Sequence, residues 1–362
     1  MELEQTIRER RSIRKFNPAP VARDKIVELM REAERLCVRD EEEPQRRYLY
    51  AGTPDARKRL ADYLTEKIED NKVAKLALGK LIGTFHKRFM EPAANIIVIA
   101  KKGKNPAEGA RNYGTACRIM QSFQLLAWRE KIGMVWITEP FVLNERFFDR
   151  IGLRADERFV GLLQIGHFDK APRGRGRTPA ERYWNVLSAP GAEVLPANES
   201  ETGARSEQIR YKDRPVPADL VLKLLNHAVW APNHRMREPW RFTYAERGAH
   251  GRAEQAANTA PPAHLIVSMR AETDEHKRDE NLAAVYCLAQ NFCLLAEERG
   301  LDAHVIFPNW MFDEAAARRL KIPDKEQIVA VLELGFRGEV RSAAAEPPPG
   351  SDKAETLRWS EL

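Results

Sequence analysis

The stretch Gln121-Ser-Phe-Gln-Leu-Leu-Ala127 returns 169 residues later as Gln290-Asn-Phe-Cys-Leu-Leu-Ala296. At the same spacing, Leu162-Leu-Gln-Ile-Gly166 matches Val331-Leu-Glu-Leu-Gly335. Matches that share one spacing indicate that a structural unit has been duplicated. The chain of 362 residues is therefore predicted to hold two copies of one unit, which agrees with a length above that of a single average domain.

A third match places an insertion in the first copy. Pro20-Val21 matches Pro215-Val216 at a spacing of 195 residues. The first copy therefore carries 195 − 169 = 26 extra residues between its early helix and its long central helix. Much of the segment Asn71–Met90 belongs to this insertion.

The boundaries between the units follow from composition. Residues 188–204 are rich in small, polar and turn-forming residues and show no periodicity, which predicts a linker. Residues 343–362 contain a Pro-Pro-Pro-Gly run and are expected to form an irregular tail. The predicted units are residues 1–187 and 205–342.

Composition excludes several classes of protein. With 43% hydrophobic residues the chain can build packed cores, yet no apolar run is long enough to span a bilayer and the charged N-terminal residues do not resemble a secretory signal. The 59 Lys and Arg are interleaved with 53 Asp and Glu, so the net charge of +6 does not indicate a nucleic-acid partner. The four cysteines show no metal-ligand spacing. We predict a cytoplasmic protein without a metal or a membrane partner.

Each unit is expected to be α+β, a mixed β-sheet flanked by helices. The helix around Gln121–Ala127 is apolar on nearly its whole circumference and must be covered on all sides. The matching helix of the other copy is the natural cover, so the two units should pack as an intramolecular pseudo-dimer. The strands are predicted at residues 95–100, 133–137 and 160–165, and at their counterparts 264–268, 303–307 and 328–334.

Two arginine clusters in the first copy suggest a phosphate site. Arg10-Arg-Ser-Ile-Arg14 precedes the first helix of the repeat, and Arg173-Gly-Arg-Gly-Arg177 follows the last strand. Guanidinium groups suit phosphate because they donate several hydrogen bonds in a fixed fork. A single cluster would be read as a charged surface, whereas two in one copy favour a shared anion. In the second copy, Ser12 and Arg14 are replaced by Glu207 and Ile209, and the carboxylate would repel a phosphate.

The second copy instead carries Ala231-Pro-Asn-His-Arg-Met-Arg-Glu-Pro-Trp240. Together, the Arg-Arg-Ser-x-Arg-x-Phe motif, the Ala-Pro-Asn…Glu-Pro-Trp loop and the late basic loop resemble the FMN-dependent nitroreductase family. The resemblance covers nearly the whole chain, twice. Family members are usually homodimers in which each FMN lies between subunits, with the phosphate held by one subunit and the Ala-Pro-Ser/Asn loop supplied by the other. Met236 and Glu238 depart from the Asn and Gln that are frequent in the family.

The resemblance implies one composite FMN site in this chain. Its expected binding residues are Arg10, Arg11, Ser12, Arg14, Arg175, Arg177, Pro232, Asn233 and His234. The backbone at Thr138-Glu139, after a predicted strand, resembles the segment that faces flavin N5. Since Pro140 has no N–H, Glu139 would have to donate, and an ordinary strand-end turn is the alternative interpretation. The reciprocal site, with Glu207, Ile209 and the acidic loop Asp40–Glu43, is not expected to bind FMN.

The implied function is that of an FMN-dependent NAD(P)H oxidoreductase, with NADH or NADPH as the electron donor. The flavin carries the chemistry and passes hydride to a small electron-poor acceptor such as a nitroaromatic compound or a quinone, so no side chain is expected to be catalytic. The chain should be a monomer with an internal pseudo-dimer. An FMN-binding protein with little or no redox turnover is the alternative. The insertion could be a lid over the substrate pocket or a surface helix, and Trp310 and Phe312 could line the pocket or belong to the core.

Overall fold

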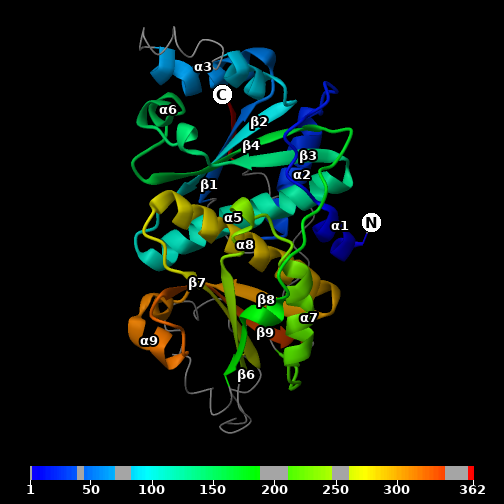
Figure 1. The fold of residues 1–362 in the computed structure, drawn as a ribbon, viewed down its shortest axis with the longest axis vertical. Helices are drawn as coiled ribbons and strands as arrows, with labels where there is room; N and C mark the ends of the chain where they lie inside the picture. The colour runs from blue at the N-terminus through cyan, green and yellow to red at the C-terminus, as the bar shows by residue number, and fades with distance from the viewer. Residues whose placement is uncertain (1, 39–44, 70–82, 188–210, 247–260, 339–357) are drawn as a thin grey trace, which may run out of the picture.

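The computed structural model describes residues 2–38, 45–69, 83–187, 211–246, 261–338 and 358–362 (Figure 1). The first unit contains helices α1 (Leu3–Glu9), α2 (Arg23–Arg35), α3 (Pro54–Glu69), α5 (Pro106–Arg129) and α6 (Glu145–Arg150), and strands β1 (Arg46–Ala51), β2 (Ala94–Lys101), β3 (Ile132–Ile137) and β4 (Glu157–His167). The second contains α7 (Ala218–Ala228), α8 (Glu275–Glu298) and α9 (Glu314–Arg319), and β6 (Trp240–Glu246), β7 (Ala263–Arg270), β8 (Leu301–Ile306) and β9 (Glu326–Phe336).

The two sheets have the same topology, as the repeat predicts. Their strand orders are β10-β1-β2-β4-β3 and β5-β6-β7-β9-β8, where β5 is Trp184–Leu187 and β10 is Trp359–Glu361. The inner strands pair antiparallel, and the strand at one edge of each sheet pairs parallel to its neighbour. Both sheets are therefore mixed, and the α+β prediction is confirmed.

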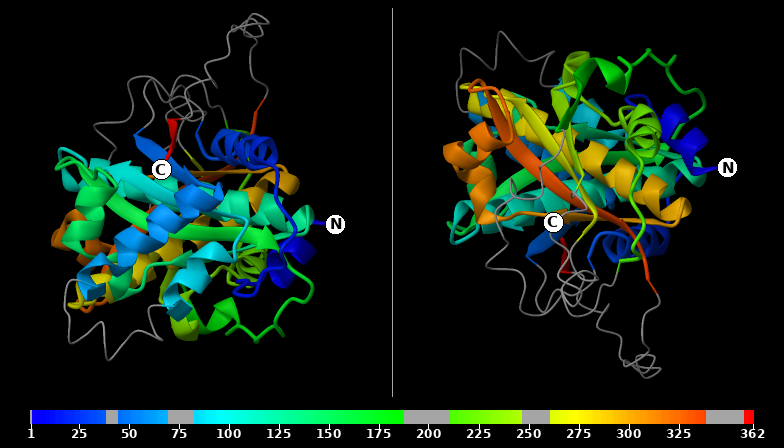
Figure 2. Two further views of the ribbon diagram at one scale, coloured as in Figure 1. Left: turned by 90° about the horizontal axis from the view of Figure 1, so that it is seen from above. Right: turned by 90° about the horizontal axis from the view of Figure 1, so that it is seen from below.

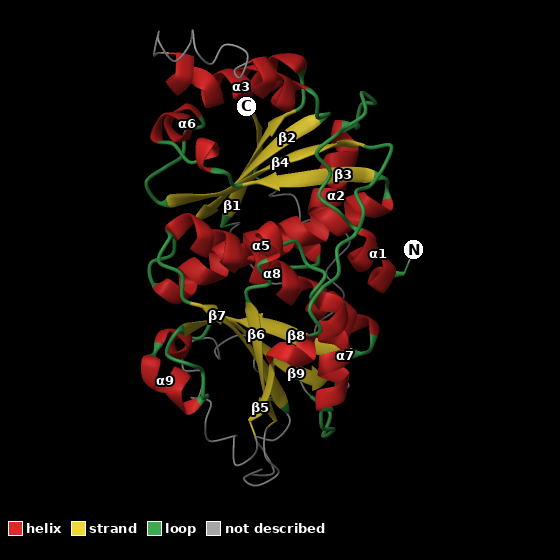
Figure 3. Ribbon diagram, viewed as in Figure 1, coloured by secondary structure: helices red, strands yellow, loops and turns green. Residues whose placement is uncertain are grey.

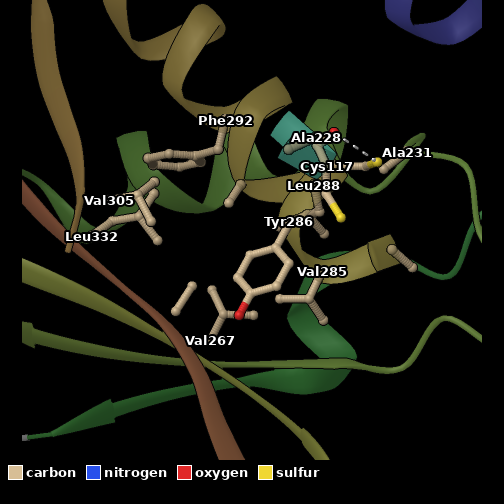
Figure 4. Packing of buried hydrophobic residues seen from close by; sticks show 14 of the residues in the cluster. Cys117, Ala228, Ala231, Val267, Val285, Tyr286, Leu288, Phe292, Val305 and Leu332 are labelled. Carbon is tan, nitrogen blue, oxygen red and sulfur yellow. Dashed lines mark hydrogen bonds between the residues drawn. The ribbon is translucent and has the colours of Figure 1, made fainter. Parts of the chain in front are cut away.

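The long helices α5 and α8 form the layer between the two sheets (Figure 3). Both helices bury a wide part of their surface, so neither would be stable without the other. Figure 4 shows Tyr286 and Phe292 of α8 reaching toward Val267 of β7 and Leu332 of β9 in one continuous apolar cluster. The hydrophobic core thus extends through both units.

Hydrogen bonds across this interface repeat by pseudo-twofold symmetry. Gln121 Nε2 donates to Asn291 Oδ1 at 2.7 Å, and Gln290 Nε2 donates to Ser122 Oγ at 3.0 Å. Each donor and each acceptor has its counterpart 169 residues away, which is the pattern of an interface between two copies of one surface. Gly114 allows the close approach of α5 to the second unit, since a Cβ there would lie 2.9 Å from the Phe307 ring. The two units therefore pack against each other through α5 and α8, as the fold prediction states, whereas a monomeric chain stays a prediction.

The units also exchange their last strands, which the sequence prediction missed. β5 (Trp184–Leu187) follows the first unit but pairs with β6 of the second, and β10 (Trp359–Glu361) follows the second but pairs with β1 of the first. The C-terminus consequently lies beside the first sheet (Figure 1). Trp184 stacks on Tyr244 at 5.7 Å between ring centroids, and Trp359 lies 5.2 Å from Tyr50. The expectation of an irregular tail is wrong for residues 359–361, because these aromatic contacts and the parallel pairing order them.

Helical segments of the first unit cover the outer face of its sheet, and the described part of the insertion supplies one of them (Figure 2). The helix α3, a helical segment over residues 83–90 and the helix α6 lie over the strands when the molecule is seen from above (Figure 2). Leu60 and Phe89 pack there with Ile97 of β2 and Phe147 of α6 in a second apolar cluster. In the described part of the chain, no helix is long and apolar enough to cross a membrane.

Candidate functional site

Arginines of the first unit meet where α1 ends. Arg10 is the C-terminal cap of α1 and is buried, and no partner for its Nε or Nη1 lies among the described residues. Arg11 Nη1 donates to the carbonyls of Arg8 and Arg10 at 2.6 and 2.8 Å, which leaves its buried Nε without a partner in the described part of the chain. Buried donors without acceptors are costly, so such a site favours a bound acceptor.

The late basic loop reaches the same place. Arg177 Nε donates to the carbonyl of Val229 at 3.1 Å, and a Cβ at Gly174 would collide with the Arg11 guanidinium. The guanidinium groups of Arg8, Arg11 and Arg177 lie 5.3, 5.9 and 5.4 Å from the centroid of one ring, that of Trp230. We call Arg8, Arg10, Arg11, Arg177 and Trp230 the arginine cluster. It combines both predicted motifs of the first unit with a residue of the second.

The electrostatics of the arginine cluster favour an anion. Burial is the main cause that lowers the pKa of the Arg10 guanidinium to about 10; the effect of Cys287 opposes this shift, and the positive charges of Arg177 and Arg11 add to it. Burial also lowers the pKa of Arg177, while Glu238 opposes that shift. The Glu238 carboxylate is itself engaged, since it accepts a hydrogen bond from the backbone N–H of Thr178 at 3.1 Å. The carboxylates that act on these guanidinium groups, Glu238 on Arg177 and Glu9 on Arg11, are fewer than the arginines of the cluster.

The loop of the second unit closes over the arginine cluster in a strained conformation. Arg235, Met236 and Glu238 have φ values of 52°, 60° and 46°, in the left-handed region that non-glycine residues rarely adopt. The Asn233 side chain stabilises the loop by accepting the Glu238 N–H at 3.2 Å, and Arg177 Nη1 lies 3.1 Å from Met236 Sδ. Strain of this kind is typical of functional sites and must be stabilised by its surroundings.

A buried carboxylate ties the other end of this loop to the first unit. Only 2% of the Glu280 side chain is exposed, and its Oε1 lies 2.9 Å from His234 Nδ1. Its Oε2 accepts from Arg237 Nη1 at 2.9 Å, and its Oε1 accepts from the Thr138 hydroxyl at 3.3 Å. His276 lies 3.6 Å from the same oxygen and donates to the Thr138 carbonyl at 2.6 Å. We call these five residues the Glu280 cluster.

The structure therefore brings most of the predicted site residues together. Arg10, Arg11 and Arg177 converge, Ser12 pairs with Met134 of β3 through an isolated bridge, and His234 reaches Thr138 through Glu280. Pro232 and Asn233 are half-buried in the same loop.

Two of the predicted residues stand apart. The side chains of Arg14 and Arg175 are exposed, although the Arg175 carbonyl accepts from Arg177 at 3.2 Å. Residues 39–44 and 188–210 lie outside the described residues, so the predicted loss of the reciprocal site, with Glu207 and Ile209, stays a prediction.

Sequence reasoning missed the residues that complete both clusters. Trp230 directly precedes the Ala231-Pro-Asn motif, so its place was readable. His276 and Glu280 share one face of α8 because they are four residues apart, but nothing in the spacing indicates Thr138 as their partner.

The two aromatic residues considered for the pocket differ in burial. Trp310 packs partly buried against the core, and Phe312 is 47% exposed.

The described part of the insertion contacts the strand end beside the Glu280 cluster. Arg88 Nη2 donates to Glu139 Oε1 at 3.0 Å, and the ring centroids of Phe85 and Phe141 are 4.6 Å apart. The second carboxylate oxygen of Glu139 is buried without a partner among the described residues. Residues 70–82, which include Lys80, lie outside the described part, so a lid stays a prediction.

The geometry defines a duplicated α+β protein whose two arginine motifs and whose second-unit loop meet between the units. A family model described as the nitroreductase family matches residues 7–167, 202–263 and 251–336. The chain belongs to the nitroreductase family.

Individual relatives each match about half of the chain or less. The Bacillus subtilis (strain 168) protein named "Putative NAD(P)H nitroreductase YfhC" is 28% identical over 162 residues, which is 38% of this chain and 84% of that protein. A structure of a nitroreductase-like family protein from Bacillus cereus is 31% identical and covers 50% of this chain and 94% of its own, with a TM-score of 0.45. A nitroreductase family protein from Clostridium novyi NT is 19% identical, covers 46% and 85%, and has a TM-score of 0.35.

Proposed function

We propose that the chain is an FMN-dependent NAD(P)H oxidoreductase with a single composite flavin site. The observation that carries this proposal is the arginine cluster, in which buried guanidinium donors of the first unit have no acceptor among the described residues. Membership of the nitroreductase family supports FMN as the ligand that would supply the acceptor. The same relationship supports NADH or NADPH as the donor and a small electron-poor acceptor.

The residues of the arginine cluster fit the phosphate of FMN. Arg10, Arg11 and Arg177 would hold the dianion through charge-assisted hydrogen bonds, which are about twice as strong as neutral ones. Trp230 would hold the guanidinium groups of Arg11 and Arg177 against its ring face. The Asn233–Arg237 loop and the Thr138-Glu139 backbone would contact the remainder of the cofactor from the second and first unit respectively.

When bound, FMN supplies a ring nitrogen that accepts hydride from the nicotinamide and returns it to the acceptor. For a nitro compound the balanced reaction is R–NO₂ + NAD(P)H + H⁺ → R–NO + NAD(P)⁺ + H₂O. The protein contributes orientation and charge. His234 is one group able to carry a proton near the Thr138 strand end, since burial lowers its pKa and keeps the ring largely neutral at pH 7.

Flavin binding tests the site. Purified protein should be yellow and bind FMN with one site per chain, as measured by fluorescence titration. Arg177→Glu should abolish binding by placing a carboxylate in the arginine cluster. Arg214→Glu is the matched control, because Arg214 stacks on Phe336 in the second unit, with 4.0 Å between its guanidinium and the ring centroid. Equal loss of flavin in both variants would overturn the site assignment.

Turnover separates the enzyme from a flavin-binding protein. Anaerobic mixing with NADH and with NADPH should bleach the flavin with at least one donor, and addition of a quinone or a nitroaromatic compound should restore the colour. A flavin that neither donor bleaches would instead support sequestration of FMN.

Analytical ultracentrifugation should give a single species near the chain mass of 41.4 kDa if the internal pseudo-dimer replaces a homodimer.

A further inference from the structure

We infer that His276 and Glu280, on the second unit, are positioning residues that orient the Thr138–Glu139 peptide of the first unit. The inference rests on the proposed function in one respect, because that peptide is the segment proposed to donate to the flavin. It adds the two side chains that hold the donor in place across the unit boundary. It also assigns a role to the buried carboxylate, which the sequence motifs do not explain.

The contact with His276 fixes the direction of the Thr138–Glu139 peptide. His276 Nε2 donates to the Thr138 carbonyl at 2.6 Å, so this oxygen faces α8. A bond between two non-proline residues is planar and almost always trans, which points the carbonyl and the following N–H in opposite directions. The Glu139 N–H therefore points away from His276. No backbone acceptor for it lies among the described residues, since the pairing of β3 ends at Ile137.

Glu280 lies beside His276 and contributes to its orientation. Glu280 lies one helical turn further along α8, and its Oε1 is 3.6 Å from His276 Nε2. The same oxygen accepts from the Thr138 hydroxyl at 3.3 Å, so the carboxylate fixes Thr138 at its side chain while His276 fixes it at its carbonyl. Arg237 balances the buried charge from the loop, and His234 Nδ1 lies 2.9 Å from Glu280 Oε1, so the carboxylate is stabilised although only 2% of its side chain is exposed.

The two copies differ at the positions of the donor and of its positioning residues. At the spacing of 169 residues, His276 and Glu280 correspond to Ala107 and Arg111, and Glu139 corresponds to Pro308. Pro308 has no N–H, so the equivalent strand end of the second unit cannot donate at all. The donor and its two positioning residues therefore occur together, in one of the two pseudo-equivalent places. A role limited to packing would not require this coincidence.

The test compares His276→Leu, which removes the donor, with His276→Gln, which can still donate from its amide. Lys277→Ala is the control, because Lys277 lies on the same turn of α8 and, among the described residues, forms its ion pair with Asp274 at the surface. The first readout needs no flavin: the amide resonance of Glu139 in the ¹⁵N–¹H spectrum of the apoprotein. It should shift or broaden in His276→Leu, remain in Lys277→Ala and recover in His276→Gln.

The second readout is the flavin. His276→Leu should bind FMN within about threefold of the wild type, yet its reduction by saturating NAD(P)H should slow by roughly 10- to 100-fold, since small errors in placement cost about that much. Its flavin midpoint potential should also shift. His276→Gln should recover most of the rate, and Glu280→Gln should fall between the two. A Glu139 resonance and a reduction rate unchanged in His276→Leu would overturn the inference. Absence of FMN binding in the wild type would overturn the proposed function instead, while the apoprotein spectrum would still decide whether His276 holds the peptide.

Discussion

Replacing Arg10 by Met should stabilise the apoprotein and weaken the FMN complex. The Arg10 side chain is buried, and its Nε and Nη1 have no acceptor among the described residues. An unsatisfied buried donor costs about 1–3 kcal/mol, and apolar replacements of buried charges are often neutral or stabilising. Met fills a similar space without these donors. We therefore expect the free energy of unfolding of apo Arg10→Met to be unchanged or higher by up to about 2 kcal/mol.

The effect on FMN has the opposite sign. A hydrogen bond to a charged group contributes about 1.5–3 kcal/mol, so the loss of Arg10 should weaken FMN binding roughly 10- to 150-fold. At FMN equal to 100 times the wild-type Kd, the wild type gains about 2.7 kcal/mol. A variant with a Kd raised about 50-fold gains only about 0.6 kcal/mol under the same conditions. Addition of FMN should therefore shift the difference in unfolding free energy by about 2 kcal/mol in favour of the wild type.

Arg118→Met is the matched control for this prediction. Arg118 is also buried, but its Nε donates to Gln290 Oε1 at 2.9 Å between the central helices. Its removal leaves a buried acceptor unpaired and should destabilise the apoprotein by about 1–3 kcal/mol without changing FMN affinity. Urea denaturation and thermal melting with and without FMN measure both variants. A loss of stability in apo Arg10→Met as large as that in Arg118→Met, or an FMN affinity within threefold of the wild type, would contradict this prediction.

Three further predictions concern the pseudo-dimer. Trp359→Ala should lower the free energy of unfolding by about 1–3 kcal/mol, because the exchanged strand loses its aromatic contact with Tyr50. Trp184→Ala should have the same effect on the other sheet, where Trp184 stacks on Tyr244. Urea denaturation that shows no loss for either variant would contradict a stabilising role of the exchange. Gln290→Leu should lower the free energy of unfolding by about 1–3 kcal/mol more than Gln121→Leu does. Gln290 bonds two buried partners, whereas Gln121 Oε1 has no partner among the described residues. Equal urea midpoints for the two variants would argue against this hydrogen-bond explanation. Gly114→Val should lower the melting temperature, because overpacking against Phe307 should reduce the free energy of unfolding by about 1–3 kcal/mol. A variant as stable as the wild type would show that the interface can adjust to the larger side chain.

The repeat made the layered fold predictable, but it did not reveal the strand exchange. The central helices carry enough apolar residues to show both their period and their need for a mutual cover. β5 and β10 are four and three residues long, too short for any alternation to be recognised. A weaker signal was present, since Trp184-Asn-Val-Leu187 and Trp359-Ser-Glu-Leu362 share their first and last residues. Composition alone marked the tail as irregular because Pro347–Gly350 dominates it.

The arginines of the site were predictable by type but not individually. Arg173, Arg175 and Arg177 alternate, and on a regular strand all three side chains would share one face. The segment is irregular in the structure, and Arg177 alone of the three turns inward to Trp230 while the other two are exposed. The Glu280 cluster was even harder to predict from the sequence, because its members come from three segments that only the packing of α8 against the first unit brings together.

The duplication itself explains how one site could be elaborated while the other is free to diverge, as the predicted loss of the reciprocal site requires. In a dimer of identical chains every substitution appears in both sites, so a change that improves one and harms the other gains nothing. In this chain the pseudo-equivalent positions are free to differ. Those that maintain the scaffold remain alike, as Gln121 and Gln290 show between the central helices, whereas the strand ends have diverged to Glu139 and Pro308. A proline at position 308 is compatible with the fold, since it precedes a short 3-10 turn, but it removes the N–H that the proposed chemistry needs. The divergence thus falls on the groups that would serve a cofactor, which is the pattern expected of one working site supported by a second, structural half.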